Sequence, residues 1–370
     1  MSAQDCDRWV PLHFHFADNS KLTIETQLLD AVINDLAIES GRPDLRIKCA
    51  IDELYQPSAL RFNNSVFPYL SLWFRYAQIL TIEKHAKYTV PPTTDLLRTI
   101  LFEYLRIAEY IFCLATFSLN IGLNKILSDL LEQYELVGRL LAMLFKNMAP
   151  EEFVSGLKGL KVLPIGFCEQ ALNTANQISL SFQELLPMLL NNRIVRARCQ
   201  RMDDQIMHRL LNFNSGPNRR ATGTAYDYRY DFSYSSYQYL FFDRVMVLPI
   251  KKRTGFCWQR LRVRCDEIFI SIYLIKQAVA RLVYLTESSN SGVSLSTISK
   301  GHTSATIETP WSALTCQMNY AGSRESCEFI LTNPLYEIGI CLRQIAIGLD
   351  LSDLPLLIAS LGLRPNMEPL

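Results

Sequence analysis

A regular helical pattern in the middle of the chain constrains its fold more than any other feature. Apolar residues recur every three or four positions from Ile126 to Leu144, which places them on one face of a helix. This pattern predicts an amphipathic helix over residues 126–147. Length and spacing predict further helices over 94–123, 167–191, 193–212 and 257–285. A chain of 370 residues that is 49% hydrophobic can bury a large core.

The helix predicted over 94–123 has a start signal and an apolar centre. The pair Pro91-Pro92 precedes it, and Thr93 or Thr94 is available as its N-cap. Its most apolar window, residues 110–123, spans 14 residues. Because a helix needs about 20 residues to cross a bilayer, we expect a buried helix here.

Strand patterns stand near the two ends of the chain. Residues 10–28 alternate loosely and predict short strands, and two alternating runs within 314–331 predict a β-hairpin. An apolar helix is expected over 353–363. The fold class that follows is α+β, with a mainly α-helical core, short N-terminal strands and a C-terminal β-hairpin or small sheet.

A composition shift divides the chain. The stretch 286–304 is rich in Ser, Thr and Gly and is the best candidate for a linker. We therefore expect a strand-containing segment over 1–90, a helical core domain over 91–285, and a C-terminal hairpin and helix over 305–370 that pack on the core.

Charge and cysteine usage exclude several classes of protein. With 37 basic and 36 acidic residues the net charge is +1, so no overall field attracts polyanions. The ten cysteines include no Cys-x-x-Cys pair, which is typical of buried thiols in a reducing compartment. We therefore assign no metal ligand. The first eight residues resemble neither a signal peptide nor a transit sequence, and we expect the protein to act where it is made.

The segment from Ser215 to Arg229 is too polar and glycine-rich to be expected in a core, yet it stands between two predicted helices. It carries three arginines and two tyrosines. Charged and aromatic side chains on a turn-rich segment suit contact with another surface. We therefore predict a contact loop that uses Arg219, Arg220, Asp227 and Arg229.

This segment resembles the Ser-Gly-Pro-x-x-Arg-x-x-Gly-x-x-x-Asp-x-Arg motif of the quinone-site subunit of respiratory complex I. That family is also called the D-type, or forty-nine-kilodalton, subunit. Four further blocks match the family in the same order along the chain: 91–122, 190–198, 249–267, and 307–310 with the hairpin after it. The resemblance implies the fold of the large subunit of nickel-iron hydrogenases, although the paired metal-binding cysteines of those enzymes are missing here.

In that family the subunit lines the cavity in which ubiquinone accepts two electrons from a 4Fe-4S cluster held by a neighbouring subunit. The resemblance thus implies a core subunit of NADH:ubiquinone reductase that binds no cofactor of its own and is inactive alone. Residues 1–90 would line the cavity. The implied partners are the iron-sulfur subunit with the terminal cluster and the membrane subunit at the quinone entry. The implied location is the matrix side of the mitochondrial inner membrane, as a peripheral subunit, and the cytoplasmic face of a bacterial membrane is the alternative. No nucleic acid is expected.

Tyr69, in Tyr69-Leu70-Ser71, is similar to the family's quinone-binding tyrosine. A phenol donates a hydrogen bond to a quinone carbonyl and can release a proton once its pKa of about 10 is lowered. We take Tyr69 as the catalytic residue. Relative to the family, one residue is deleted just after this motif. Tyr76 or Tyr55 is therefore the alternative counterpart of the quinone-binding tyrosine.

The family's quinone-facing histidine and the aspartate behind it are replaced here. Aligning the strand that starts at Lys21 places His15 at the first histidine of the family's turn and Asn19 at the quinone-facing one. The aspartate corresponds to Asn120. Asparagine can donate a hydrogen bond but supplies no proton. Because the histidine and the aspartate are both replaced, neither leaves the other as a buried charge without a partner. A register shift that brings His13 or His15 into the role is the alternative.

Arg46 aligns with the arginine of a family turn beside the neighbouring cluster, where a cation raises the reduction potential. Two other functions remain open at this point. The replacements at Asn19 and Asn120 suggest a catalytically degenerate structural subunit of the same complex. The Tyr-Arg-rich region 217–237 suggests an RNA-stacking surface.

Overall fold

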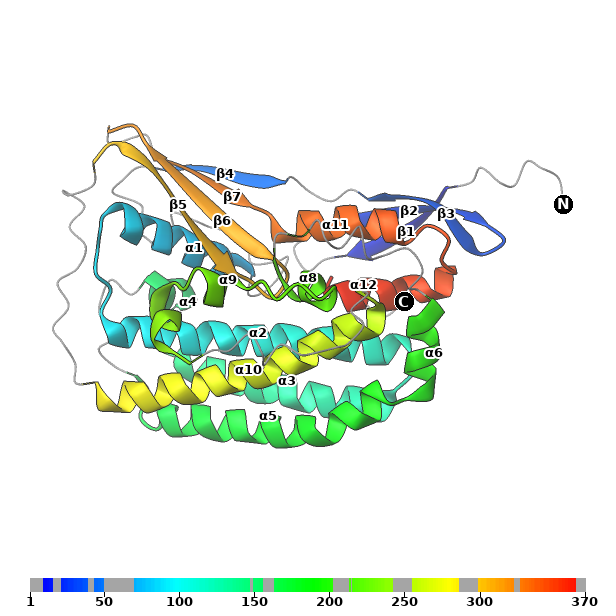
Figure 1. Ribbon diagram of the computed structural model, residues 1–370, viewed down its shortest axis with the longest axis horizontal. Helices are drawn as coiled ribbons and strands as arrows, with labels where there is room; N and C mark the ends of the chain where they lie inside the picture. Colours follow the sequence, from blue (N-terminus) through cyan, green and yellow to red (C-terminus); the bar gives the residue numbers. More distant parts are fainter. Residues whose placement is uncertain are drawn as a thin grey trace.

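The computed structural model describes residues 9–15, 21–38, 43–49, 70–146, 149–155, 163–201, 213, 215–241, 255–285, 299–322 and 327–363. Long helices form one layer of the molecule, and a β-sheet with shorter helices forms a second layer above it (Figure 1). The α+β class predicted for the chain is confirmed.

Four long helices make up the helical layer (Figure 1): α2 (Pro92–Asn120), α3 (Asn124–Leu144), α5 (Phe167–Leu190) and α10 (Cys257–Tyr284). Helix α2 packs against α3 and α10, and α5 packs against the same two helices, so the four close into a bundle. All four confirm the predicted helices, and their ends lie within three residues of the predicted ends. The helix predicted over 193–212 is confirmed as α6 (Arg193–Arg201), while residues 202–212 lie outside the described part of the chain.

Helix α2 lies at the centre of the molecule and is buried on nearly every side. Its N-cap is Pro91, whose side chain makes no capping hydrogen bond, so the predicted threonine cap is wrong. Pro92 instead occupies the first turn, where its missing N–H leaves no hydrogen bond unmade. Within the described residues, no helix is long and apolar enough to cross a membrane.

Helix α1 (Leu70–His85) was not expected from the sequence. It packs against two strands of the sheet and against α4 (Pro150–Ser155). Thirteen of its sixteen residues are buried. A helix that is enclosed on all sides has no polar face, and therefore no amphipathic period that marks it in the sequence.

The larger sheet has four antiparallel strands in the order β4-β7-β6-β5. The strands are β4 (Asp44–Cys49), β7 (Cys327–Thr332), β6 (Ala313–Tyr320) and β5 (Gly301–Glu308). Strands β6 and β7 confirm the predicted hairpin. Residues 301–304 belong to β5, so the predicted end of the linker at residue 304 is wrong. The Ser and Thr residues that suggested a linker there occupy half-buried positions of the sheet. Strand β4 pairs along its whole length with β7, which joins the N-terminal segment to the C-terminal sheet.

A second sheet of three antiparallel strands confirms the strands predicted over 10–28. It contains β1 (Trp9–His15), β2 (Lys21–Leu29) and β3 (Val32–Ile38). Two C-terminal helices complete the upper layer. Helix α11 (Pro334–Ile345) was not predicted and packs against β3, whereas α12 (Leu354–Leu361) confirms the last predicted helix and packs on α2 and α10.

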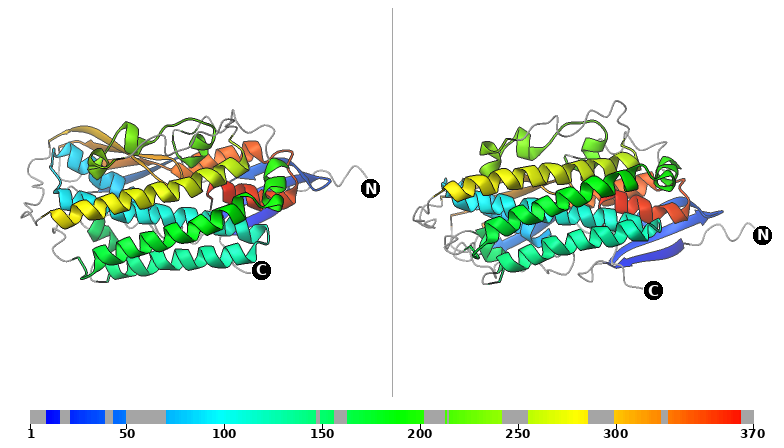
Figure 2. Two further views of the ribbon diagram at one scale, coloured as in Figure 1. Left: turned by 60° about the horizontal axis from the view of Figure 1, so that its bottom comes forward. Right: turned by 90° about the horizontal axis from the view of Figure 1, so that it is seen from below.

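The polar segment predicted as a contact loop contains the short helix α8 (Pro217–Ala221) and the start of α9 (Tyr228–Asp231), and the 3-10 helix η3 (Ser235–Tyr239) follows it. Helix α8 packs on α10, α9 contacts β5, and η3 contacts α2. The segment therefore lies between the helical layer and the sheet, and both views of Figure 2 show it alongside α10.

Candidate functional site

The polar segment is largely buried, which corrects the expectation that its composition excludes it from the core. Asn218, Arg220, Asp227 and Arg229 are each at most 4% exposed. Carboxylates from three distant elements neutralise the arginines: Glu103 of α2, Glu267 of α10 and Glu308 of β5. Because buried charges are stable only when they are paired and hydrogen-bonded, this polar cluster is what allows the segment to enter the core.

Arg229 joins the segment to α2. Its Nη1 donates to both oxygens of Glu103 at 3.1 Å, and its Nη2 donates to Asp227 Oδ2 at 2.7 Å. Asp227 is also the N-cap of α9, accepting a hydrogen bond from the Arg229 backbone N–H at 2.9 Å. The same carboxylate thus starts a helix and holds the arginine that follows it.

Arg220 joins the segment to α10 and to the sheet. Its Nε donates to Glu267 Oε1 at 2.5 Å, and its Nη1 donates to Glu308 Oε1 at 2.6 Å. The side chain is 2% exposed. One guanidinium therefore connects two carboxylates that lie on different layers of the molecule.

Glu308 draws together both ends of the segment. Its carboxylate accepts hydrogen bonds from the backbone N–H groups of Gly216 and Tyr228, each at 3.1 Å, and from the Ser215 hydroxyl. Gly216 is required for this approach: its φ is 95°, and a Cβ there would lie 2.2 Å from the backbone oxygen of Trp311. The Ser-Gly-Pro part of the motif is thus explained by a close packing contact.

The charges of the polar cluster stabilise one another. Burial by itself raises the pKa of the Glu103, Asp227 and Glu267 carboxyls, but the neighbouring arginines outweigh burial and hold each pKa below its usual value. Arg106 of α2 adds a third cation, 3.5 Å from Glu103. Carboxylates that stay ionised and fully hydrogen-bonded suit a structural role and are poor proton donors.

Arg219 is the one predicted contact residue that is partly exposed. Its guanidinium carbon lies 5.2 Å from the centre of the Tyr226 ring, and its Nη1 donates to the Phe213 carbonyl at 2.8 Å. A direct contact with another subunit stays a prediction for Arg219. For Arg220, Asp227 and Arg229 it is wrong, because their side chains are buried by other parts of this chain. Arg220 and Arg229 are therefore also not available to the RNA-stacking surface suggested over 217–237.

The predicted quinone-site residues lie at the ends of described elements or beyond them. Asn19 and Tyr69 are outside the described residues, although Tyr69 directly precedes the first residue of α1. His15 ends β1 and is opposite Lys21 in the register of β2. Asn120 ends α2, is exposed, and donates its amide to the Thr116 carbonyl at 2.8 Å. The proximity of Asn19 to Asn120 stays a prediction.

Tyr76, the alternative to Tyr69, is a core residue. It is 1% exposed, and its ring stacks on Phe102 with 4.1 Å between centroids. Burial, followed by the charge of Asp95, raises the pKa of Tyr76 well above its usual value. The rings of Phe102 and Tyr234 both pack against it, so the Tyr76 ring is enclosed by this chain. Tyr55, the other alternative, is outside the described residues.

Arg46 lies within strand β4, so the expected turn at this position is wrong: the strand is held by continuous pairing with β7. Its side chain is 66% exposed and forms an ion pair with Asp44 at 3.3 Å. An exposed guanidinium on a sheet edge is free to face a neighbouring protein. Its role beside the iron-sulfur cluster stays a prediction.

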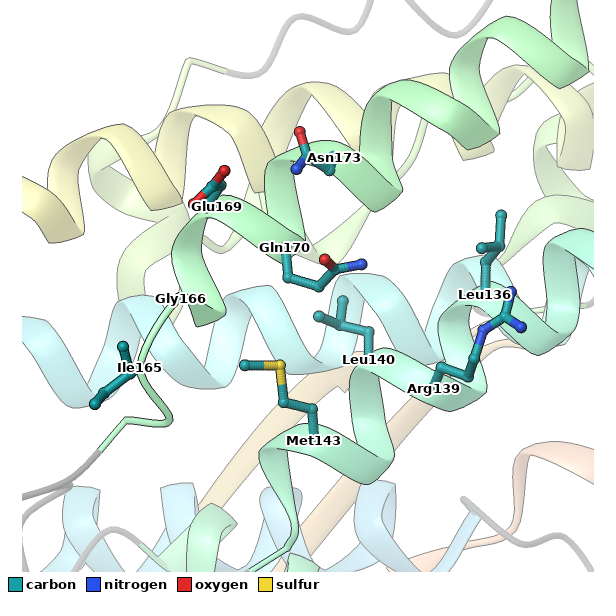
Figure 3. A pocket seen from close by; sticks show the side chains of 9 residues that line it. All are labelled: Leu136, Arg139, Leu140, Met143, Ile165, Gly166, Glu169, Gln170 and Asn173. Carbon is teal, nitrogen blue, oxygen red and sulfur yellow. The ribbon is translucent and has the colours of Figure 1, made fainter.

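Two surface grooves stand out among the described residues. One, of about 440 Å³, lies between α3 and α5 and is lined by Leu136, Arg139, Leu140, Met143, Ile165, Gly166, Glu169, Gln170 and Asn173 (Figure 3). The other, of about 450 Å³, lies between β3 and α11. None of the predicted quinone-site residues lines either groove. No group of three or more His, Cys, Asp or Glu side chains within the described ranges could hold a metal ion.

Comparison with known proteins connects these features to a family. Residues 156–296 match the family model described as "Respiratory-chain NADH dehydrogenase, 49 Kd subunit". The chain is 28% identical over 212 residues to a D-type subunit of NADH-quinone oxidoreductase from Opitutus terrae, covering 55% of this chain and 47% of that protein. It is 27% identical over 296 residues to the D-type subunit of NADH-quinone oxidoreductase from Carboxydothermus hydrogenoformans, covering 78% of each chain. It is 26% identical over 229 residues to the H-type subunit of NAD(P)H-quinone oxidoreductase from a Synechococcus strain, covering 60% of this chain and 57% of the relative.

The chain thus spans about half the length of the first of these relatives and more of the second. The matched region 156–296 contains the polar segment and the whole of α10, which supply Arg220, Asp227, Arg229 and Glu267 to the polar cluster. The resemblance predicted from the sequence is confirmed at modest identity. Over the matched parts, the chain is similar to the D-type, or 49-kilodalton, subunits of NADH-quinone oxidoreductases.

Proposed function

We propose that this chain is a core subunit of respiratory complex I and forms part of the wall of its ubiquinone-reduction cavity. The observation that carries the proposal is the similarity to the D-type subunit of an NADH-quinone oxidoreductase over 78% of both chains. In this function the chain takes part in electron transfer from NADH to ubiquinone, coupled to proton translocation, and acts only within the assembled complex.

The residues of this wall have different roles in quinone reduction. A quinone carbonyl that gains electrons is stabilised by hydrogen-bond donors, and two protons must follow the two electrons. Tyr69 donates to the carbonyl and supplies a proton. Asn19, Asn120 and His15 line the same wall, where the two amides can donate hydrogen bonds but cannot replace the proton of a histidine.

The polar cluster supports this wall without taking part in the reaction. Helix α2 ends at Asn120, and the same helix carries Glu103 and Arg106, which the cluster anchors to α9 and β5. A side chain on an anchored helix keeps its position when a substrate binds.

The proposal also includes partners and a location. Electrons arrive from a 4Fe-4S cluster of a neighbouring iron-sulfur subunit, near Arg46, and quinone enters beside a membrane subunit. The location is the matrix side of the mitochondrial inner membrane. Cell fractionation followed by protease protection of intact and of inner-membrane vesicles checks this location.

The test is co-migration in native membranes. Membranes are solubilised gently, complexes are separated by size, and this chain is followed together with NADH:quinone reductase activity. We expect the chain in the fractions that carry inhibitor-sensitive activity. A chain found alone contradicts membership of the complex, and a chain found in a large but inactive particle supports the catalytically degenerate alternative.

A further inference from the structure

Two buried cysteines meet where α6 contacts the beginning of α10. The Cys199 thiol, on α6, donates a hydrogen bond to the sulfur of Cys257, and the two Sγ atoms are 3.5 Å apart. Both side chains are 0% exposed. The sulfurs of a disulfide are about 2.05 Å apart, so a shift of about 1.5 Å would bring this pair to bonding distance.

Positive charge surrounds Cys257. Arg260 and Arg264 lie one and two turns further along α10 and are at most 1% exposed. Arg260 donates to the Ser360 hydroxyl and the Gly255 carbonyl, and Arg264 donates to Asn218 and to a backbone carbonyl. Neither forms an ion pair within the part of the chain that the structure describes. A thiolate at Cys257 would supply the negative charge that two buried cations favour.

The ionisation of Cys257 reflects this setting. Burial raises the pKa of the Cys257 thiol, but the hydrogen bond from Cys199, the charges of Arg260 and Arg264 and hydrogen bonding with Ser360 together lower it to about 7. Cys257 is also the first residue of a 28-residue helix, where the helix dipole favours a thiolate. From α2, two further titratable groups lie nearby: the thiol of Cys113, whose own pKa is raised by burial, and the buried carboxyl of Glu109.

We propose that Cys199 and Cys257 form a peroxide-sensitive dithiol that links α6 covalently to the start of α10. The Cys257 thiolate attacks one oxygen of a hydroperoxide; the O–O bond breaks, giving a sulfenic acid and hydroxide or alkoxide. Cys199 then attacks the Cys257 sulfur, and the S–O bond breaks as water leaves with the Cys199 proton. The two thiols lose two electrons in total, and the peroxide is reduced by two.

A second cysteine pair provides an internal comparison. Cys49 and Cys327 are directly opposite each other in the β4–β7 pairing. Hydrogen bonding with Cys49, followed by burial, raises the pKa of the Cys327 thiol, and no arginine contributes. Similar proximity without a cationic environment should leave this pair unreactive, because the thiolate is the reacting form.

The experiment treats native membranes that contain the full-length chain with hydrogen peroxide at neutral pH. Remaining thiols are then blocked in denaturant and the protein is digested with trypsin. Cleavage after arginine releases Cys199 in residues 199–201 and Cys257 in residues 254–260, so their cross-link has a unique mass. We expect this cross-link to form at least ten times faster than the link between Cys49 and Cys327, and to disappear on reduction.

Matched variants assign the two roles. In Cys199→Ser, a sulfenic acid should accumulate at Cys257 and be trapped by dimedone, because the resolving thiol is missing. In Cys257→Ser, Cys199 should remain unlabelled. Equal rates for the two cysteine pairs, a cross-link that forms only in denaturant, or trapping at Cys199 in place of Cys257 would overturn the proposal.

Discussion

Glu308 and Tyr69 illustrate two ways in which a single polar residue serves this protein. The Glu308 carboxylate accepts hydrogen bonds from Arg220, from Ser215 and from two backbone N–H groups, so its acceptor positions are occupied within the chain. It therefore stabilises structure. Tyr69 is proposed to donate a hydrogen bond to the quinone and then to transfer its hydroxyl proton during the reaction.

At the residue scale, we predict that Tyr69→Phe lowers quinone reductase activity at least tenfold while the complex still assembles. Phenylalanine keeps the ring and removes only the hydroxyl, and general acid catalysis typically contributes about 10²–10⁴-fold. Activity is measured in native membranes and normalised to the amount of assembled complex.

Tyr284→Phe is the matched control, because Tyr284 is 86% exposed at the end of α10. It should leave activity unchanged. Full activity in Tyr69→Phe would show that the assignment of Tyr69 is mistaken while the membership of the complex stands.

At the element scale, the turn that leads into α8 depends on the absence of a side chain. We predict that Gly216→Ala lowers the free energy of unfolding by about 2–4 kcal/mol, since a β-carbon would meet the Trp311 carbonyl and the positive φ disfavours alanine. Urea unfolding of the full-length chain measures the change.

Gly138→Ala makes the same chemical change within helix α3, where a Cβ would meet nothing within 4 Å. It should raise stability by about 0.5–1 kcal/mol, because alanine loses less conformational freedom in a helix. A similar effect of the two substitutions would contradict the close approach at Gly216.

At the scale of the whole molecule, buried carboxyls of two kinds set the pH dependence of stability. Glu103, Asp227 and Glu267 have lowered pKa values, so they stabilise the fold above the unfolded values of about 4, and this contribution is lost as the pH falls further. Asp266 behaves in the opposite way: burial raises its pKa to about 6, so the folded chain gains stability as the pH falls from about 6 to 4.

We therefore predict a shallow rise in the free energy of unfolding from pH 7 to pH 5 and a steep fall below pH 4. One strongly paired aspartate alone accounts for about 2–3 kcal/mol of such a fall. Urea unfolding across this range measures the profile. Asp266→Asn should make the rise smaller but keep the fall, because burial also raises the pKa values of Glu83 and Asp95. Stability that stays constant down to pH 3 would contradict the ion pairing of the polar cluster.

Much of the architecture was predictable because the information is local. The apolar period in α3 and the alternation in β6 and β7 each lie within one continuous stretch, and both predictions are confirmed. Helix α1 was missed for the same reason, since a fully enclosed helix carries no polar face. Of the predicted site, the resemblance of the motif 215–229 to the family is confirmed, but its exposure was predicted wrongly.

The amino-acid sequence by itself determined the positions of the long helices, the C-terminal hairpin and the resemblance to the family. Only the tertiary structure decided that Arg220, Asp227 and Arg229 are buried and that β4 joins the C-terminal sheet. The physical reason is distance along the chain: Arg106 donates to the Glu308 carbonyl across 202 positions, and Arg229 meets Glu103 across 126. A polar segment enters a core when distant charges neutralise it, and a local pattern carries no record of those partners.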